Sequence, residues 1–229
     1  MLREIVFDTE TTGLNPKEGD KLVEIGALEL INHIATGRTY HVYINPMREV
    51  PEEAFKIHGL STEFLSNYPK FSEVAKDFLS FVGEDGIMVA HNASFDMNFI
   101  NYELKHNGFK TLENHEVIDT LQIAKSKFPG ARHNLDALCK RFNIDNSKRT
   151  KHGALLDAEL LAEVYLELLG GAEPSMNLEQ KVDKSFIENI YVQSEKKYEK
   201  RSFKLNEQEQ KEHEDFLEKH IKNALWTQG

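Results

Sequence analysis

Residues 3–14 read REIVFDTETTGL, an apolar run that ends in acidic residues. A strand through this stretch directs Asp8 and Glu10 to one face. Ile5 and Phe7 then point to the opposite face. Carboxylates side by side repel each other, and a cation that neutralises them removes this cost, with Mg²⁺ or Mn²⁺ suiting an all-oxygen site. The alternative is a pair of acids at a solvated strand end.

The remaining pattern predicts a mixed α/β fold. β-branched and aromatic residues favour strands in some segments, and helical spacing of apolar residues favours helices in others. We expect strands at 3–8, 22–31, 38–45, 86–92 and 117–119, a turn or short helix at 51–61, and helices at 71–82, from an N-cap at Ser94 to about Asn107, and within 119–169. The first three strands suit an antiparallel meander, and the later ones suit parallel pairing. The prediction is a five-stranded mixed sheet flanked by helices.

A third acidic residue, Asp96, falls in the first turn of the helix that follows the strand at 86–92. This placement brings it toward the sheet edge where Asp8 is expected. Taken alone, Asp96 is better explained as a first-turn acid that the helix dipole favours.

His152 and Asp157 form the last candidate group. They are five residues apart, about 500° around a helix, so one helix cannot point both the same way. We therefore expect His152 in the loop before the helix and Asp157 facing inward from its first turns. An imidazole titrates near neutral pH, as a general base requires. Taken alone, an exposed histidine and a helical acid remain the better explanation.

Three segments in order resemble the exonuclease motifs of the DnaQ-like, DEDDh family: DTETTGL (8–14), NASFD (92–96) and HGALLDAELLAEVY (152–165). The resemblance extends over residues 3–169. It implies a ribonuclease-H-like fold and a 3′→5′ exonuclease that hydrolyses phosphodiesters with two divalent ions, Mg²⁺ or Mn²⁺. The residues implied are the metal ligands Asp8, Glu10, Asp96 and Asp157, which are also catalytic, and the general base His152.

The resemblance also implies a set of substrate contacts. PEEAFKIHGLS (51–61) is similar to the family segment that contacts the terminal nucleotide. There Glu53 would accept from the 3′-hydroxyl, and Ile57 with His58 would wedge or stack against bases. The alternative is a solvated helix with a turn histidine. The expected substrate-binding residues are Asp8, Glu10, Glu53, His58 and Asp157. Asp119 is predicted to be an N-cap and not a fifth ligand.

The net charge of −10 argues at first against a nucleic-acid partner, because Lys and Arg normally bind phosphate. Residues 1–124, however, carry 10 basic and 20 acidic side chains, whereas 125–152 carry eight basic and two acidic ones. The resemblance implies that Lys148, Arg149 and Lys151 border the path of the DNA backbone. The alternative is a solvated basic surface.

Residues 131–168 closely resemble the proofreading exonucleases of bacterial replicative DNA polymerases. This implies removal of mispaired 3′-terminal nucleotides, as mononucleotides, from single-stranded or frayed DNA. Two alternatives stay open. One is a stand-alone nuclease that trims RNA or DNA 3′ ends, and the other is a mainly structural subunit that stabilises a polymerase.

The chain is predicted to divide into an exonuclease domain (1–171), a flexible linker (172–205) and a C-terminal segment (206–229), which is helical to about residue 225 and contains Trp226. A tethered subunit needs such a tail, because tethering raises the local concentration. By resemblance, the C-terminal segment binds the polymerase α subunit. PSMNL (174–178) faintly resembles a sliding-clamp-binding peptide without the leading Gln, and a θ-type accessory subunit is a further candidate partner.

The composition indicates a cytoplasmic protein with no membrane partner. Cys139 is the only cysteine, so no disulfide forms within one chain. No apolar stretch approaches the ~18 residues of a membrane span. MLREIVFDTE, at the N-terminus, meets a charge too early for a secretory signal.

Overall fold

The structure is a computed structural model of the 229-residue chain, and it describes residues 1–171 and 206–220. The chain divides into two units, Met1–Met176 and Asn177–Gly229. The helix α9 (Glu207–His220) belongs to the second unit. Within the described ranges, no helix combines the length and apolar character needed to cross a membrane.

A five-stranded sheet with the order β3-β2-β1-β4-β5 forms the centre of the first unit. β1 pairs antiparallel with β2, and β2 pairs antiparallel with β3. β4 runs parallel to both β1 and β5. The strands are β1 (Arg3–Thr11), β2 (Leu22–Ile31), β3 (Ile34–Tyr43), β4 (Ile87–Ala90) and β5 (Val117–Asp119). The expected mixed sheet, a meander joined to parallel strands, is confirmed, and β1 lies at its middle.

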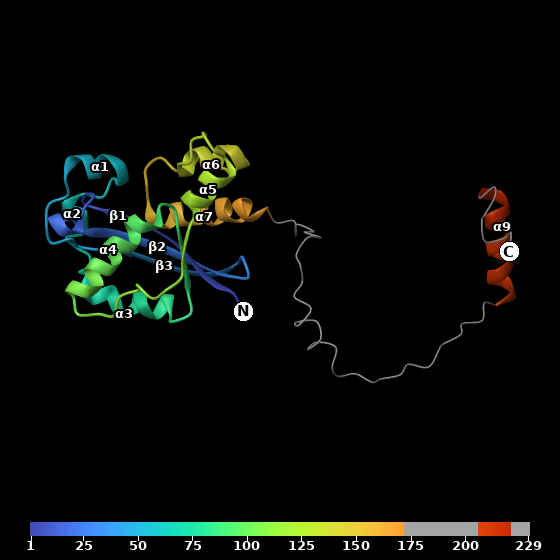
Figure 1. Ribbon diagram of the computed structural model, residues 1–229, viewed down its shortest axis with the longest axis horizontal. Helices are drawn as coiled ribbons and strands as arrows, with labels where there is room; N and C mark the ends of the chain where they lie inside the picture. The colour runs from blue at the N-terminus through green and yellow to red at the C-terminus, as the bar shows by residue number, and fades with distance from the viewer. Residues whose placement is uncertain (172–205, 221–229) are drawn as a thin grey trace. The chain divides into compact units, whose positions relative to one another are not determined.

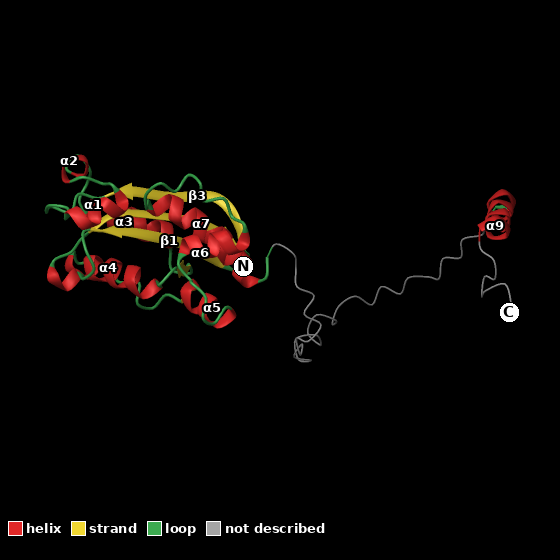
Figure 2. Ribbon diagram, turned by 90° about the horizontal axis from the view of Figure 1, so that it is seen from above, coloured by secondary structure: helices red, strands yellow, loops and turns green. Residues whose placement is uncertain are grey.

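Helices cover both faces of this sheet. Figures 1 and 2 show α3 and α4 on one side of the strands and α5, α6 and α7 on the other. The helical segments of the first unit are η1 (Pro16–Glu18), α1 (Glu52–His58), α2 (Thr62–Leu65), α3 (Phe71–Val82), α4 (Ala93–His106), α5 (Thr120–Lys127), α6 (Leu135–Phe142) and α7 (Ala154–Leu169). α7 packs across β1 and β2, next to the strand that carries the first two carboxylates.

The alternation of side chains along β1 divides the core into two layers. Ile5 and Phe7 are fully buried in a cluster with residues of α3 and α4. Val6 is fully buried in a second cluster with residues of α6 and α7. A strand can fill both layers only when both faces are covered, which explains why the apolar run in β1 is almost continuous.

Several boundaries differ from those expected: β1 continues to Thr11 and not to 8, β3 ends at Tyr43 and not at 45, and β4 spans Ile87–Ala90 and not 86–92. Two other differences have a clear local cause. β3 starts at Ile34 and not at 38, because a two-residue turn at Asn32 and His33 joins it directly to β2. Both turn residues have positive φ, 50° and 66°, as the hairpin turn that matches strand twist requires. Ser94 is not the N-cap of α4. Asn92 takes that position with φ 67°, a left-handed conformation that Asn tolerates better than most residues.

The predicted tail lies largely beyond the described ranges. Residues 172–205, including the 174–178 segment, fall outside them, and so does Trp226. The helical prediction for about 206–225 is confirmed only over α9. The domain boundaries stay a prediction.

Candidate active site

Two carboxylates lie at the C-terminal end of the central strand β1. In the antiparallel ladder Asp8 is paired with Gly26 of β2, and Glu10 is paired with Glu24. Glu10 is only 7 % exposed. The local cause is the period of two in a strand, which directs both carboxylates to the α7 side of the sheet, away from Phe7.

Asp96 reaches the same edge of the sheet from α4. β4 runs parallel to β1, so the helix that follows β4 begins where β1 ends. Asp96 is buried in the first turn of α4. The hydroxyl Oγ1 of Thr9 donates to Asp96 Oδ1 at 2.6 Å, which fixes the orientation of the carboxylate. The third acidic residue thus lies beside the β1 pair, as expected.

The start of α7 brings the fourth carboxylate to the sheet. A Cβ on Gly26 would lie 2.1 Å from the backbone nitrogen of Leu155, so the first turn of α7 rests directly on the backbone of β2. Asp157, in this turn, is buried. His152 precedes the N-cap Gly153 and is therefore outside the helix, as predicted. Ligand atoms of Glu10, His152 and Asp157 all lie within 4.8 Å of one another.

Arg149 lies inside this cluster. Seven of the eight basic side chains of 125–152 are exposed, and Arg149 is the exception. Its Nε and Nη2 donate to the two oxygens of Asp157 at 2.6 and 2.7 Å. Its Nη1 donates to Asp136 at 2.9 Å, and Nη2 lies 2.8 Å from His152 Nδ1. The sequence led us to expect Arg149 beside the DNA, and the structure places it among the carboxylates.

The carboxylates of the cluster differ in the direction in which their pKa values are shifted. Burial, with the charges of the neighbouring carboxylates, raises the pKa of Asp8 well above its usual range and that of Glu10 to about 8. Burial also raises the pKa of Asp96 to about 7, although the Thr9 hydroxyl opposes this rise. Burial would raise the pKa of Asp157 too, but the hydrogen bonds and charge of Arg149 lower it below the ordinary value. When its four carboxylates are ionised, the cluster carries more negative charge than Arg149 can balance.

This donor set fits divalent metal ions. Carboxylate oxygens are the ligands that Mg²⁺ and Mn²⁺ prefer, and buried carboxylates with raised pKa values gain most from a cation. The residues that would hold the ions are Asp8, Glu10, Asp96 and Asp157. Asp119, in contrast, accepts from the backbone nitrogens of Leu121 and Asn92 at 2.9 and 3.0 Å. It is the N-cap of α5, as predicted.

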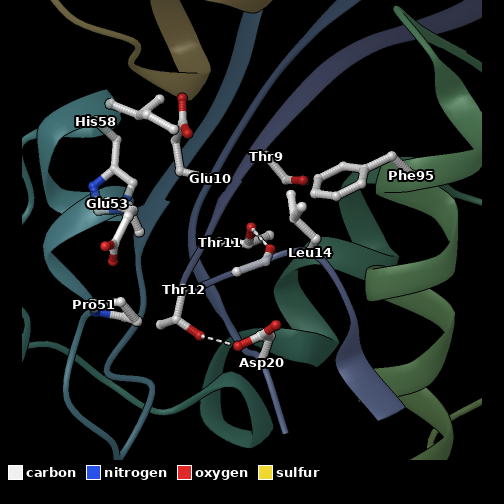
Figure 3. Close-up of a pocket in the computed structure, with 13 residues that line it drawn as sticks. Thr9, Glu10, Thr11, Thr12, Leu14, Asp20, Pro51, Glu53, His58 and Phe95 are labelled. Atoms are coloured by element: carbon white, nitrogen blue, oxygen red, sulfur yellow. Dashed lines mark hydrogen bonds between the residues drawn. The ribbon is translucent and has the colours of Figure 1, made fainter. Parts of the chain in front are cut away.

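A pocket of about 530 Å³ adjoins the carboxylate cluster at Glu10. Figure 3 shows Glu10, Glu53 and His58 on one side of it and Phe95 on the other. The pocket therefore joins the predicted α1 residues to the end of β1. Its lining consists of Thr9, Glu10, Thr11, Thr12, Gly13, Leu14, Asp20, Pro51, Glu53, Ala54, Ile57, His58 and Phe95.

Ile57 and His58, the two α1 side chains predicted to wedge or stack against bases, differ in exposure. His58 is only 5 % exposed, and its Nδ1 accepts from the backbone nitrogen of Leu60 at 3.0 Å. Burial lowers the pKa of His58. Ile57 is 51 % exposed and Leu14, across the pocket, is 83 % exposed. The exposed apolar surface available to a base is therefore that of Ile57 and Leu14, and His58 forms part of the pocket wall.

The loop with His152 is attached to α1. The backbone nitrogen of His152 donates to the carbonyl of Ile57 at 3.2 Å. Lys151 Nζ lies 5.0 Å from the ring centroid of Phe55, a cation–π contact. These contacts hold the loop of the candidate general base against α1, although Phe55 and Lys151 are 96 residues apart in sequence.

Sequence reasoning missed several residues of this site. Thr9 lies between the two acidic residues of its motif, and Phe95 directly precedes Asp96. Their only sequence signal was this position inside a motif. Leu14 gave a similar signal at the end of TETTGL. Gly26, in EIGALE, gave only the weak signal of a glycine inside a strand, which often marks a close backbone approach. Arg149 was expected beside the DNA backbone, and no sequence signal indicated its contact with Asp157, because the direction of its side chain depends on the fold.

Carboxylates from β1, α4 and α7 around one sheet edge, beside a histidine and an open pocket, are the arrangement expected of a ribonuclease-H-like nuclease that uses divalent metal ions. The model of the Exonuclease family matches residues 5–165, and the chain belongs to this family. The nuclease domain of 3′hExo, a DEDDh family member, has the same fold: the TM-score is 0.63 at 16 % identity, with 73 % of this chain and 91 % of that one covered.

Within the Exonuclease family, two curated relatives that match this chain are subunits of a DNA polymerase. The DNA polymerase III subunit epsilon of Rickettsia conorii is 49 % identical over 230 residues, which cover 97 % of this chain and 98 % of that protein. The subunit of the same name from Escherichia coli K12 is 51 % identical over 176 residues, which cover 74 % of this chain and 72 % of that one. Among exonucleases, the chain thus groups with the epsilon subunits and is a 3′→5′ exonuclease.

Proposed function

We propose that this chain removes mispaired 3′-terminal nucleotides from DNA, as mononucleotides, while bound to a replicative polymerase. The observation that carries the proposal is the gathering of carboxylates at one sheet edge: the charges of Asp96, Glu10 and Asp157 all act on Asp8, and Glu10 and Asp157 lie within 4.8 Å of His152 beside an open pocket. The grouping with epsilon subunits supports the choice of DNA and of proofreading over trimming of RNA ends.

The four carboxylates are the proposed metal ligands. Two bound divalent ions, Mg²⁺ or Mn²⁺, would supply activation of a water molecule and stabilisation of the leaving 3′-oxygen. The chain itself fixes the carboxylates before any ion binds. Thr9 orients Asp96, and the contact between Gly26 and Leu155 holds Asp157 against the sheet. Such preorganisation lowers the cost of assembling the charged transition state.

His152 is the proposed general base. Its side chain is 48 % exposed and its backbone is held by Ile57, so the imidazole can reach solvent while its attachment point stays in place. An imidazole in this position would take a proton from an attacking water. Asp157 Oδ2 lies 3.3 Å from His152 Nδ1, close enough to pair with the imidazolium that results.

The pocket next to Glu10 is the proposed site of the terminal nucleotide. Glu53, which lines the pocket, would accept a hydrogen bond from the terminal 3′-hydroxyl and so position the 3′ end. The exposed apolar side chains of Leu14 and Ile57 would contact bases, and the buried His58 would shape the pocket. The stacking of a base on apolar side chains is tolerant of sequence, as a proofreader needs.

The C-terminal part of the chain is the proposed attachment to the polymerase. We assign the exonuclease domain to 1–171, a linker to 172–205 and binding of the polymerase III α subunit to 206–229. Full-length similarity to epsilon subunits supports this division. A sliding clamp and a θ-type subunit are further candidate partners, and replication places the work in the cytoplasm.

A primer assay tests the proposal. The purified chain, with and without the α subunit, is given matched and mismatched DNA primers and an RNA of the same sequence, in Mg²⁺. Faster release of mononucleotides from the mismatched DNA end is expected. Asp8→Ala should abolish release while the circular dichroism spectrum stays unchanged. Undiminished release by this variant would refute the metal assignment, and preferential digestion of RNA would refute the proofreading role.

A further inference from the structure

Arg149 is the side chain of the site that the proposed mechanism does not use. Its guanidinium is 7 % exposed, although the residue lies in a loop between α6 and α7. Two of its nitrogens bind both oxygens of Asp157, and a third binds Asp136 on α6. A bidentate pair of this kind is among the strongest side-chain interactions in proteins, so the contact defines the resting state.

This contact competes with metal binding at Asp157. The oxygens that a divalent ion needs accept from Arg149 at 2.6 and 2.7 Å. A guanidinium at that distance would also lie within a few ångströms of any ion on the same carboxylate, and like charges so close repel strongly. Full coordination by Asp157 therefore requires Arg149 to withdraw.

The same guanidinium also contacts His152, the proposed general base. Nη2 of Arg149 lies 2.8 Å from Nδ1 and 3.3 Å from Nε2 of His152. Arginine has donors only, so the imidazole must accept with a lone pair. A base whose lone pair is engaged in this way is not free to take a proton from water. One side chain thus blocks a ligand and the base together.

We propose that Arg149 is the resident counter-cation of the metal centre, and that metal binding displaces it and thereby frees His152. The inference rests on the metal site of the proposed function. Asp136, which is 54 % exposed, keeps a partner for the displaced guanidinium outside the carboxylate cluster. The arrangement keeps the buried carboxylates partly neutralised before metal arrives and ties activation of the base to occupancy of the ligands.

Mn²⁺ titration of the full-length chain, followed by electron paramagnetic resonance without DNA, tests the displacement. Arg149→Met should bind Mn²⁺ about 10- to 100-fold more tightly than wild type, because no charged hydrogen-bonded pair has to break. Arg149→Lys keeps the charge but loses the fork, and should also bind more tightly. The matched control is Arg141→Met, which removes an equal charge from an exposed side chain stacked on Phe128.

The variants separate direct occupation from a general field effect. Wild-type affinity in Arg149→Lys, or equal gains in Arg149→Met and Arg141→Met, would show that only net charge matters and would overturn the proposal. Weaker Mn²⁺ binding by Arg149→Met would do the same, because it would make Arg149 a support of the occupied site. The metal-free Arg149→Met protein should melt at a lower temperature than wild type, and Mn²⁺ should remove the difference.

A measurement on wild type needs no substitution. Nitrogen NMR of the labelled chain should show the Arg149 Nε and His152 Nδ1 resonances moving together as Mg²⁺ saturates the protein. Saturation without any such movement would overturn the displacement while leaving the metal site intact. Failure of wild type to bind Mg²⁺ or Mn²⁺ at all would instead refute the proposed function, so the two failures are distinguishable.

Discussion

Substitution of Gly26 by alanine tests whether the contact of α7 with β2 assembles the site. Propensity alone predicts a gain in stability of about 0.5–1 kcal/mol, because glycine weakens a strand. The structure predicts the opposite sign. The new Cβ would lie 2.1 Å from Leu155 N, 2.3 Å from Ala154 C and 2.4 Å from Leu155 Cα, all backbone atoms that cannot rotate away.

The magnitude follows from the displacement that these distances demand. Restoration of ordinary contact, from 2.1 Å to at least 3.4 Å, moves the first turn of α7 by at least about 1.3 Å. Overpacking of this kind costs about 1–3 kcal/mol. In a protein of this size that lowers the melting temperature by about 2–12 °C. The same turn carries Asp157, and misplacement by about 1 Å of a catalytic group can cost on the order of 10²-fold in rate.

Differential scanning fluorimetry and single-turnover digestion of a mismatched primer measure the two effects of Gly26→Ala. Gly153→Ala is the matched control for stability: it changes a glycine at the start of the same helix, where φ is −152° and an added Cβ meets nothing within 4 Å. Its cost should not exceed about 1 kcal/mol. A Gly26→Ala protein that melts at or above the wild-type temperature and digests at the wild-type rate would refute the reasoning.

Three further predictions concern the base, pH and the tail. His152→Ala should slow hydrolysis by about 10²–10⁴-fold with Mn²⁺ affinity changed only a few-fold; a parallel loss of Mn²⁺ binding would make His152 a ligand instead. Because the folded-state pKa values of Glu10 and Asp96 are raised to about 8 and 7, their contribution to the stability of the metal-free protein is present at low pH and is lost as pH rises from about 4 to 8. Mg²⁺ should therefore raise the melting temperature more at pH 8.5 than at pH 6.0, and equal shifts would contradict these pKa values. Deletion of 173–229 should leave digestion of free oligonucleotides intact and abolish co-purification with the polymerase α subunit, and retained co-purification would place the binding surface in the exonuclease domain.

The limits of sequence reasoning are clearest at the residues where β3 and α4 begin. The turn at Asn32 and His33 lacks the glycine that usually marks a tight hairpin. The sequence therefore predicted the start of β3 at residue 38, four residues later than its observed start at Ile34. Ser94 is a favoured capping residue, but the backbone after β4 turns at Asn92 and the helix starts immediately. In both cases the boundary is set by non-glycine residues in the left-handed conformation, and not by the residue types that usually mark a turn or a cap.

What the sequence by itself determined is the chemistry and its local placement. The period of a strand directs Asp8 and Glu10 to one face. The spacing of His152 and Asp157 prevents one helix from pointing both side chains the same way, because these relations depend only on backbone geometry between near neighbours. Only the tertiary structure decided which distant groups meet: Thr9 with Asp96, Gly26 with the start of α7, and Arg149 with Asp157. Such contacts depend on how packed layers bring backbones together, and no local pattern encodes the direction in which Arg149 folds, inward to a carboxylate or outward to DNA.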